Sequence, residues 1–177
     1  MVGLKLKKMQ GTSNLVQAVR YNEGKVDWTY LPWSYAMMKD MERKINTLPS
    51  SWSDNLQDLI VYLEDKDVFG VLCCSLLLYD NQEVVLNTEA QINLPYTALE
   101  QVCRVFAYGA EVKYSRDNYK LSPGLPLEGY IQSMWRHLVE YLRGNPVDDE
   151  SKLHHLSHVA CNAFMYLWTQ KEYHSKG

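Results

Sequence analysis

Residues 124–168 decide the fold, and their sequence is GLPLEGYIQSMWRHLVEYLRGNPVDDESKLHHLSHVACNAFMYLW. Apolar residues recur in this stretch at the three- and four-residue spacing of an α-helix, on both sides of a Gly-Asn-Pro break at residues 144–146. We therefore expect two helices, one over about 127–142 and a second that continues to about 171. Acids favour the positive end of a helix dipole, so we expect the second helix to open at residues 148–151.

The same periodicity predicts helices earlier in the chain. We expect them over 34–45, from a start at Ser53 to about 65, and from Pro95 to a break at Gly109. The apolar run 68–79 favours a helix, although such a run also fits a buried strand, and residues 80–86 leave a small β-hairpin open. The fold class is therefore all-α, a mostly helical bundle with the option of one hairpin.

Composition limits the class of protein. A chain of 177 residues with 46% hydrophobic residues fits a single domain, residues 1–177. The net charge of -3 gives no basic field for nucleic acid. No apolar run is long enough for a membrane span, and none follows the N-terminal lysines as in a signal peptide. Four cysteines without metal-site spacing indicate reduced thiols, so we expect a cytoplasmic protein that binds neither nucleic acid nor membrane.

Histidines and acids gather in the last two predicted helices. His155, His158 and Asn162 share one side of the final helix, while His137 lies on the preceding helix and Glu150 precedes the final one. Such mixed donors bind divalent metals: carboxylates suit Mg²⁺ or Mn²⁺, and imidazoles move the preference toward Mn²⁺, Co²⁺ or Zn²⁺. The spacing alone favours another interpretation, in which His158 and Asn162 satisfy each other or backbone groups and Asp148 to Glu150 cap a helix.

Other catalytic arrangements have little support in the sequence. A Walker-type phosphate loop, a GxSxG elbow and a CxxC pair are all absent from it. Cys161 is expected to be a small core residue. Cationic and aromatic residues occur together at 20–25 and 113–119, which suits a nucleotide and equally suits solvent-exposed loops.

Three passages resemble a known family. They are RYNEGKVDW at 20–28, GAEVKYSRDNYK at 109–120 and SMWRHLVEYLRGNPVDDESKLHHLSHVACNAFMYL at 133–167. In order and spacing they are similar to the phage dATP/dGTP diphosphohydrolase family. Lys152 stands where that family usually has Gly, and Tyr119 where it has Trp. Residues 35–95 separate two blocks that the family holds closer together, so we interpret them as an atypical insert.

The resemblance implies an all-α, MazG-like enzyme that uses a divalent metal to split dATP or dGTP into monophosphate and pyrophosphate. The roles that follow for this chain are catalytic for Glu150, His155 and His158. The expected metal ligands are Glu150, His155, His158, His137 and Asp149. The expected substrate-binding residues are Arg20, Lys25, Lys113 and Arg136 for phosphates, and Tyr114, Asn118 and Asn162 for base or sugar. Either Tyr114 or Tyr119 could stack on a purine base.

The same resemblance implies a homo-oligomer, a dimer or larger, and a phage origin that would place the protein in the host cytoplasm. Two alternatives stay open. One is a nucleotide-binding or signalling-molecule-binding protein without turnover, built from the same cations and tyrosines. The other is an interaction protein that uses the 35–95 region to dock a partner.

Overall fold

The protein is described by a computed structural model over residues 24–80, 91–121 and 124–174. Within these residues the chain folds into α-helices with short helical turns between them, and no strand is present there. The helices are α2 (Tyr35–Thr47), α3 (Trp52–Glu64), α4 (Val68–Asp80), α5 (Tyr96–Tyr108), α6 (Leu127–Leu142) and α7 (His155–Thr169). The prediction of an all-α fold is confirmed. The hairpin expected at 80–86 lies almost wholly outside the described residues, and α4 includes its first position.

The centre of the bundle is α4, which is apolar on nearly every side. Its buried residues run from Val68 to Leu78 and include both Cys73 and Cys74. A helix that is hydrophobic all round is stable only when other helices cover it, and α4 packs against α3, α7, α2 and α5. Residues 35–80 therefore contribute the core of the molecule, and they contact the helices that carry the histidines.

A close approach between α3 and α4 depends on a glycine. A Cβ atom placed on Gly70 would lie 2.6 Å from Cγ of Tyr62. Real Cβ atoms do not come so close to a neighbouring ring, so the two helices can pack at this distance only because residue 70 lacks a side chain.

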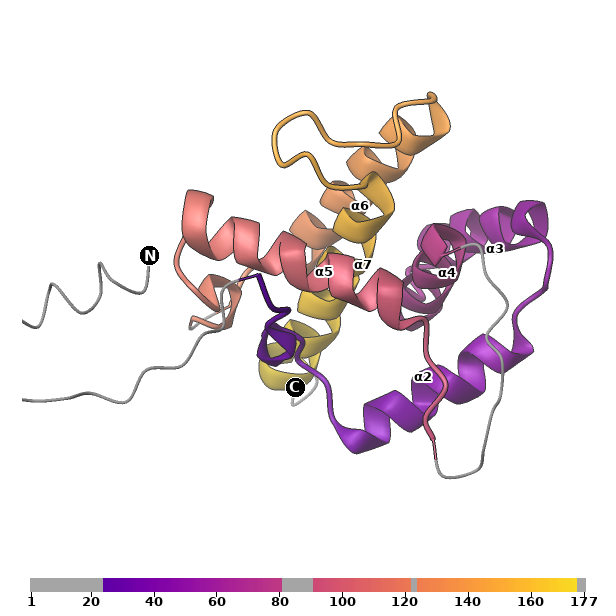
Figure 1. Ribbon diagram of the computed structural model, residues 1–177, viewed down its shortest axis with the longest axis horizontal. Coiled ribbons are helices and arrows are strands. Elements are labelled where there is room, and N and C mark those ends of the chain that lie inside the picture. The colour runs from indigo at the N-terminus through magenta and orange to yellow at the C-terminus, as the bar shows by residue number, and fades with distance from the viewer. Residues whose placement is uncertain (1–23, 81–90, 122–123, 175–177) are drawn as a thin grey trace, which may run out of the picture.

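Helices α6 and α7 form an antiparallel pair, and α5 crosses α7 (Figure 1). The loop that joins α6 to α7 projects at the top of this view, above α5. The C-terminal end of α7 lies at the bottom of this view, and the π-helical turn Gln170–His174 follows it. The site residues predicted between 113 and 162 come from α6, α7, the turn and loop that follow α5, and the loop between α6 and α7.

Several predicted boundaries need correction. Ser51, not Ser53, caps α3, because its hydroxyl accepts a hydrogen bond from the backbone N–H of Asp54. Gly109 does not break the chain out of helix: its φ of -61° is helical, and the chain continues as a π-helical turn over Gly109–Lys113. His154 is half-buried against the rings of Tyr79 and Tyr141.

The start of the last helix was predicted wrongly, since α7 begins at His155 and not at the acids of 148–151. Those acids lie in a loop closed by an isolated antiparallel bridge between Val147 and His154. Lys152 has a φ of +64°, which a right-handed helix does not allow. The side chain of His154 caps the start of α7, since its Nδ1 accepts a hydrogen bond of 3.0 Å from the backbone N–H of Leu156.

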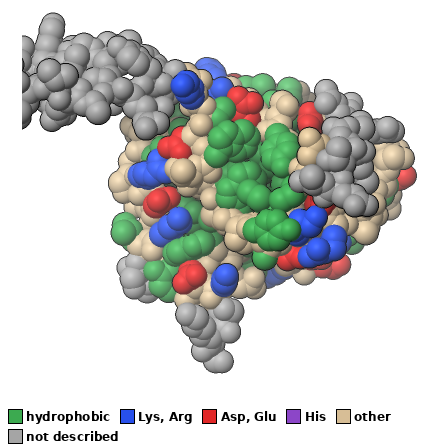
Figure 2. Space-filling model, turned by 60° about the horizontal axis from the view of Figure 1, so that its bottom comes forward, with side chains coloured by type: hydrophobic (Ala, Val, Ile, Leu, Met, Phe, Trp, Pro, Cys, Tyr) green, Lys and Arg blue, Asp and Glu red, His purple; other side chains and the backbone are tan. Residues whose placement is uncertain are grey.

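The face of the molecule at the bottom of Figure 1 carries many apolar side chains. Figure 2 shows apolar side chains gathered in the middle of this face, with lysines, arginines and acids around them. No histidine is visible on the part of this face that the structure describes. Among the described residues, no helix is both long and apolar enough to span a membrane.

Candidate functional site

Three side chains from separate elements converge near the α6–α7 loop. They are His137 on α6, His155 at the first position of α7, and Asp148 in the loop between them. One nitrogen or oxygen atom from each lies within 4.8 Å of the others. Nδ1 of His137 is 2.9 Å from Nδ1 of His155. We call these three residues the His–Asp cluster.

The geometry of the His–Asp cluster fits a divalent cation. Two ligands bonded to one cation at about 2.0–2.1 Å lie about 2.9–3.4 Å apart when their angle is between a right angle and the tetrahedral angle. The two Nδ1 atoms are at the short end of that range. Two imidazoles and one carboxylate suit Mn²⁺, Co²⁺ or Zn²⁺ better than Mg²⁺, which prefers oxygen ligands.

The third histidine stands beside the cluster. The ring of His158 stacks on that of His137 with centroids 4.3 Å apart. Nε2 of His158 is 2.7 Å from the hydroxyl of Ser151, which itself accepts a hydrogen bond from the backbone N–H of Leu153. Nε2 therefore shares a hydrogen bond with Ser151, and this nitrogen also lies 3.8 Å from Asp148.

Burial keeps His137 and His158 uncharged. Desolvation, reinforced by the neighbouring imidazoles, lowers the pKa of His137 to about 3. Desolvation likewise lowers the pKa of His158 to about 4, although Asp148 opposes this. Burial alone would raise the pKa of Asp148, but hydrogen bonds from Ser151 and the nearby histidines hold it below its usual value. Neutral imidazoles beside an ionised carboxylate are the forms that metals bind.

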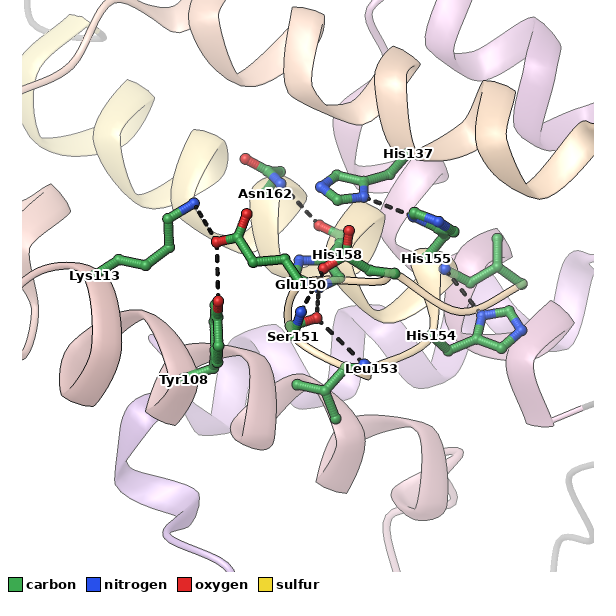
Figure 3. Close-up of polar contacts among 12 residues, drawn as sticks. Tyr108, Lys113, His137, Glu150, Ser151, Leu153, His154, His155, His158 and Asn162 are labelled. Atoms are coloured by element: carbon green, nitrogen blue, oxygen red, sulfur yellow. Dashed lines mark hydrogen bonds and ion pairs between the residues drawn. The ribbon is translucent and has the colours of Figure 1, made fainter. Parts of the chain in front are cut away.

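The other two predicted acidic ligands lie away from the cluster. Oε1 of Glu150 accepts a hydrogen bond from the hydroxyl of Tyr108 at 2.9 Å and lies 3.1 Å from Nζ of Lys113 (Figure 3). The phenol first and the ammonium second lower the pKa of this carboxyl. Asp149 is exposed on the same loop.

A pocket of about 640 Å³ opens beside the cluster. Its described lining has three parts. Aromatic side chains form one part: Tyr30, Phe106, Tyr108, Tyr114, Tyr119 and Tyr130. Lys113 and Arg136 are the lysine and arginine of the lining, and the acids and histidines are Asp117, His137, Asp148, Glu150 and His158. Cations, aromatic rings and a candidate metal cluster thus border one cavity.

The pocket also gathers most of the residues predicted to bind substrate. Lys113, Tyr114, Asn118, Arg136 and Asn162 all line it. The amide nitrogen of Asn162 donates to the backbone oxygen of His158, at 2.9 Å.

Two residues predicted to bind phosphate are not found in the described lining of the pocket. Lys25 is exposed and is not part of the described lining, and Arg20 lies outside the described residues. Tyr119, considered for stacking on a base, is buried, whereas Tyr114 is 62% exposed. Glu140 pairs with Arg143 and not with Arg136, so Arg136 remains available at the pocket.

Three residues of the site were missed by sequence reasoning. Asp148 was assigned to a helix start, and Ser151 and Tyr108 were given no role. The family's Gly at position 152 is the sequence signal that could have revealed the loop. Gly favours a positive φ, and Lys152 has one in the structure. Tyr108 and Glu150 are 42 residues apart in the sequence, so no local sequence pattern predicts their contact.

Comparisons with known proteins identify the family to which this chain belongs. The family model described as dATP/dGTP diphosphohydrolase, N-terminal, matches residues 86–176, just over half of the chain. The chain therefore belongs to the dATP/dGTP diphosphohydrolase family. A dATP/dGTP diphosphohydrolase from Salmonella phage PMBT28 is 39% identical over 69 residues, which cover 39% of this chain and 22% of the relative. No solved structure matches the chain.

The matched region contains α5, α6 and α7 and hence the whole His–Asp cluster. The segment around Lys25 and helices α2, α3 and α4 precede it. Whether residues 35–95 are an insert relative to the family stays a prediction.

Proposed function

We propose that the protein hydrolyses a purine deoxynucleoside triphosphate, dATP or dGTP, to the monophosphate and pyrophosphate with the help of a divalent cation. The observation that carries this proposal is the convergence of His137, Asp148 and His155 within 4.8 Å, next to a pocket that holds Lys113 and Arg136. Membership of the diphosphohydrolase family supports the reaction type.

His137, Asp148 and His155 would hold the cation. Glu150 lines the same pocket and would join them only by leaving Tyr108 and Lys113. A bound divalent metal neutralises phosphate charge and lowers the pKa of water. The lysine and arginine of the pocket bind phosphate oxygens, the arginine in a two-pronged manner.

The aromatic part of the lining accommodates the base. Tyr114 offers an exposed ring for stacking, and Asn118 and Asn162 carry both donors and acceptors for a base edge or the sugar. His158 and Glu150 border the same cavity and are the groups that can accept a proton from an attacking water.

The proposal is tested by incubating the protein with each of the four deoxynucleoside triphosphates and Mn²⁺ or Mg²⁺. We expect equal amounts of monophosphate and pyrophosphate from dATP or dGTP, and none in the presence of a chelator. Glu150→Gln and His155→Ala should each lower the rate about 100-fold. Glu128→Gln is the matched control, because Glu128 pairs with Lys66 and does not line the pocket.

Two results would contradict the proposal. One is release of orthophosphate in place of pyrophosphate, which would mean attack at a different phosphorus atom. The other is tight nucleotide binding with no product under any metal condition, which would instead support a binding protein without turnover.

A further inference from the structure

Glu150 is held by two groups at the edge of the pocket. Its Oε1 atom accepts a hydrogen bond from the hydroxyl of Tyr108, at the end of α5. The same atom forms an ion pair with the ammonium of Lys113, in the π-helical turn that follows α5. We call this arrangement the Glu150 clasp. In Figure 3, Glu150 lies between Lys113 and Tyr108 on one side and His158 on the other.

The Glu150 clasp borders both the His–Asp cluster and the pocket. Glu150 is two residues from Asp148 in the sequence. Its negative charge raises the pKa of His158, against the larger effect of burial. All three side chains of the clasp line the pocket together with Asp148 and His137. The carboxylate that Lys113 holds therefore lies in the same cavity as Asp148 and His137.

Lys113 has a stronger partner in a triphosphate than in Glu150. The side chains of Lys113 and Glu150 are 43% and 60% exposed, and exposed ion pairs of this kind hold weakly. A triphosphate brings three to four negative charges to the same cavity, whereas Glu150 offers one. Phosphate oxygens should therefore displace the carboxylate from the ammonium.

We propose that Lys113 exchanges partners: without nucleotide it holds Glu150 away from the His–Asp cluster with the help of Tyr108, and with nucleotide it binds phosphate and releases Glu150 to the metal. This inference rests on the proposed function. It makes Tyr108 and Lys113 positioning residues for Glu150, and it makes completion of the metal site depend on arrival of the substrate.

The test is a set of Mn²⁺ titrations on the full chain without nucleotide, by calorimetry or by the electron paramagnetic resonance signal of free Mn²⁺. Lys113→Met should raise Mn²⁺ affinity about fivefold, a change of the size that an exposed ion pair contributes. Tyr108→Phe should raise it about twofold. Glu150→Gln alone should change it little, because Glu150 is withheld from the metal in this state.

The double variant Lys113→Met with Glu150→Gln separates release of Glu150 from simple loss of a positive charge. If Lys113 acts through Glu150, the gain in affinity disappears in the double variant. If the two substitutions are additive, the charge alone explains the gain and the proposal is overturned. Lys66→Met is the matched control, because Lys66 forms a similar exposed pair with Glu128 away from the pocket.

The nucleotide arm uses a non-hydrolysable α,β-methylene analogue of dATP. It should raise Mn²⁺ affinity in the wild-type protein more than in Glu150→Gln, since only the wild type gains a carboxylate ligand on exchange. Equal enhancement in both proteins would contradict the exchange. If wild-type protein binds no Mn²⁺ at all, the proposed function fails with it, whereas additive substitutions with normal Mn²⁺ binding overturn the exchange alone.

Discussion

Nδ1 of His137 lies 2.9 Å from Nδ1 of His155, although the two residues belong to different helices. The packing of α6 on α7 and the closed loop between them set this separation. Two ring nitrogens this close share either a proton or a cation. Asp148 within 4.8 Å supplies the negative charge that favours the cation.

Substitution of either histidine should therefore weaken metal binding. His137→Asn and His155→Asn should each lower Mn²⁺ affinity by more than about tenfold, and the double variant should lose little more, because the site is already broken. Isothermal titration calorimetry measures these affinities. His174→Asn, at an exposed position on the last helical turn, is the control and should bind Mn²⁺ as the wild type does. Unchanged affinity in both cluster variants would rule out the assignment.

The buried histidines predict an acid-sensitive fold. In the folded state the pKa of His137 is about 3 and that of His158 about 4, below the ordinary value of 6.5. The unfolded chain therefore takes up protons first, so their contribution to stability is complete above about pH 6.5 and is lost as the pH falls toward 4. Each histidine should lower the free energy of unfolding by about 1 kcal/mol per pH unit in this window.

Urea unfolding of the metal-free protein at a series of pH values measures this loss. His158→Asn should give a flatter dependence between pH 6.5 and 4.5 than the wild type, whatever its absolute stability. An identical slope in the two proteins would show that His158 is protonated in the folded state.

Lys152 occupies a conformation that suits glycine. Its φ of +64° places it in the left-handed region, which costs an ordinary residue about 1–2 kcal/mol. Lys152→Gly should raise the free energy of unfolding by about 0.5–1 kcal/mol, since the greater freedom of glycine in the unfolded chain offsets part of the gain. Lys152→Ala keeps the Cβ atom and should bring no gain. A Gly variant less stable than the Ala variant would contradict this account of the loop.

Two glycines in helices should respond in opposite ways to replacement by alanine. At Gly70 the new Cβ would lie 2.6 Å from the Tyr62 ring, so Gly70→Ala should destabilise the protein by about 1–3 kcal/mol. At Gly129 in α6 nothing lies within 4 Å of the new atom, so Gly129→Ala should stabilise it by about 0.5–1 kcal/mol. Thermal unfolding compares the two, and a Gly70→Ala variant as stable as the wild type would mean that α3 and α4 are not packed this closely.

The helices could be predicted from sequence because apolar spacing reports directly on burial. Leu127–Leu142 was expected within a residue or so, and α2, α4 and α5 were expected within about two residues at each end. The spacing does not show which helix lies at the centre. That α4 is covered on nearly all sides follows from its contacts with four other helices, which are long-range in sequence.

The site was harder to predict than the fold. His137 and His155 were identified because residue type and helix register bring their side chains to one region. Asp148 was missed because three consecutive acids also resemble the first turn of a helix, and only the left-handed Lys152 shows that they form a loop. The partners of Glu150 could not be predicted, since Tyr108 and Lys113 reach it from another part of the chain.

The central claim is that His137, Asp148 and His155 bind one divalent cation beside the nucleotide pocket. Anomalous diffraction from crystals of the protein soaked in Mn²⁺ tests it most directly. The account predicts one manganese peak within about 2.0–2.4 Å of both Nδ1 atoms and of a carboxylate oxygen of Asp148. Manganese bound only elsewhere, with the two imidazoles still hydrogen-bonded to each other, would contradict it.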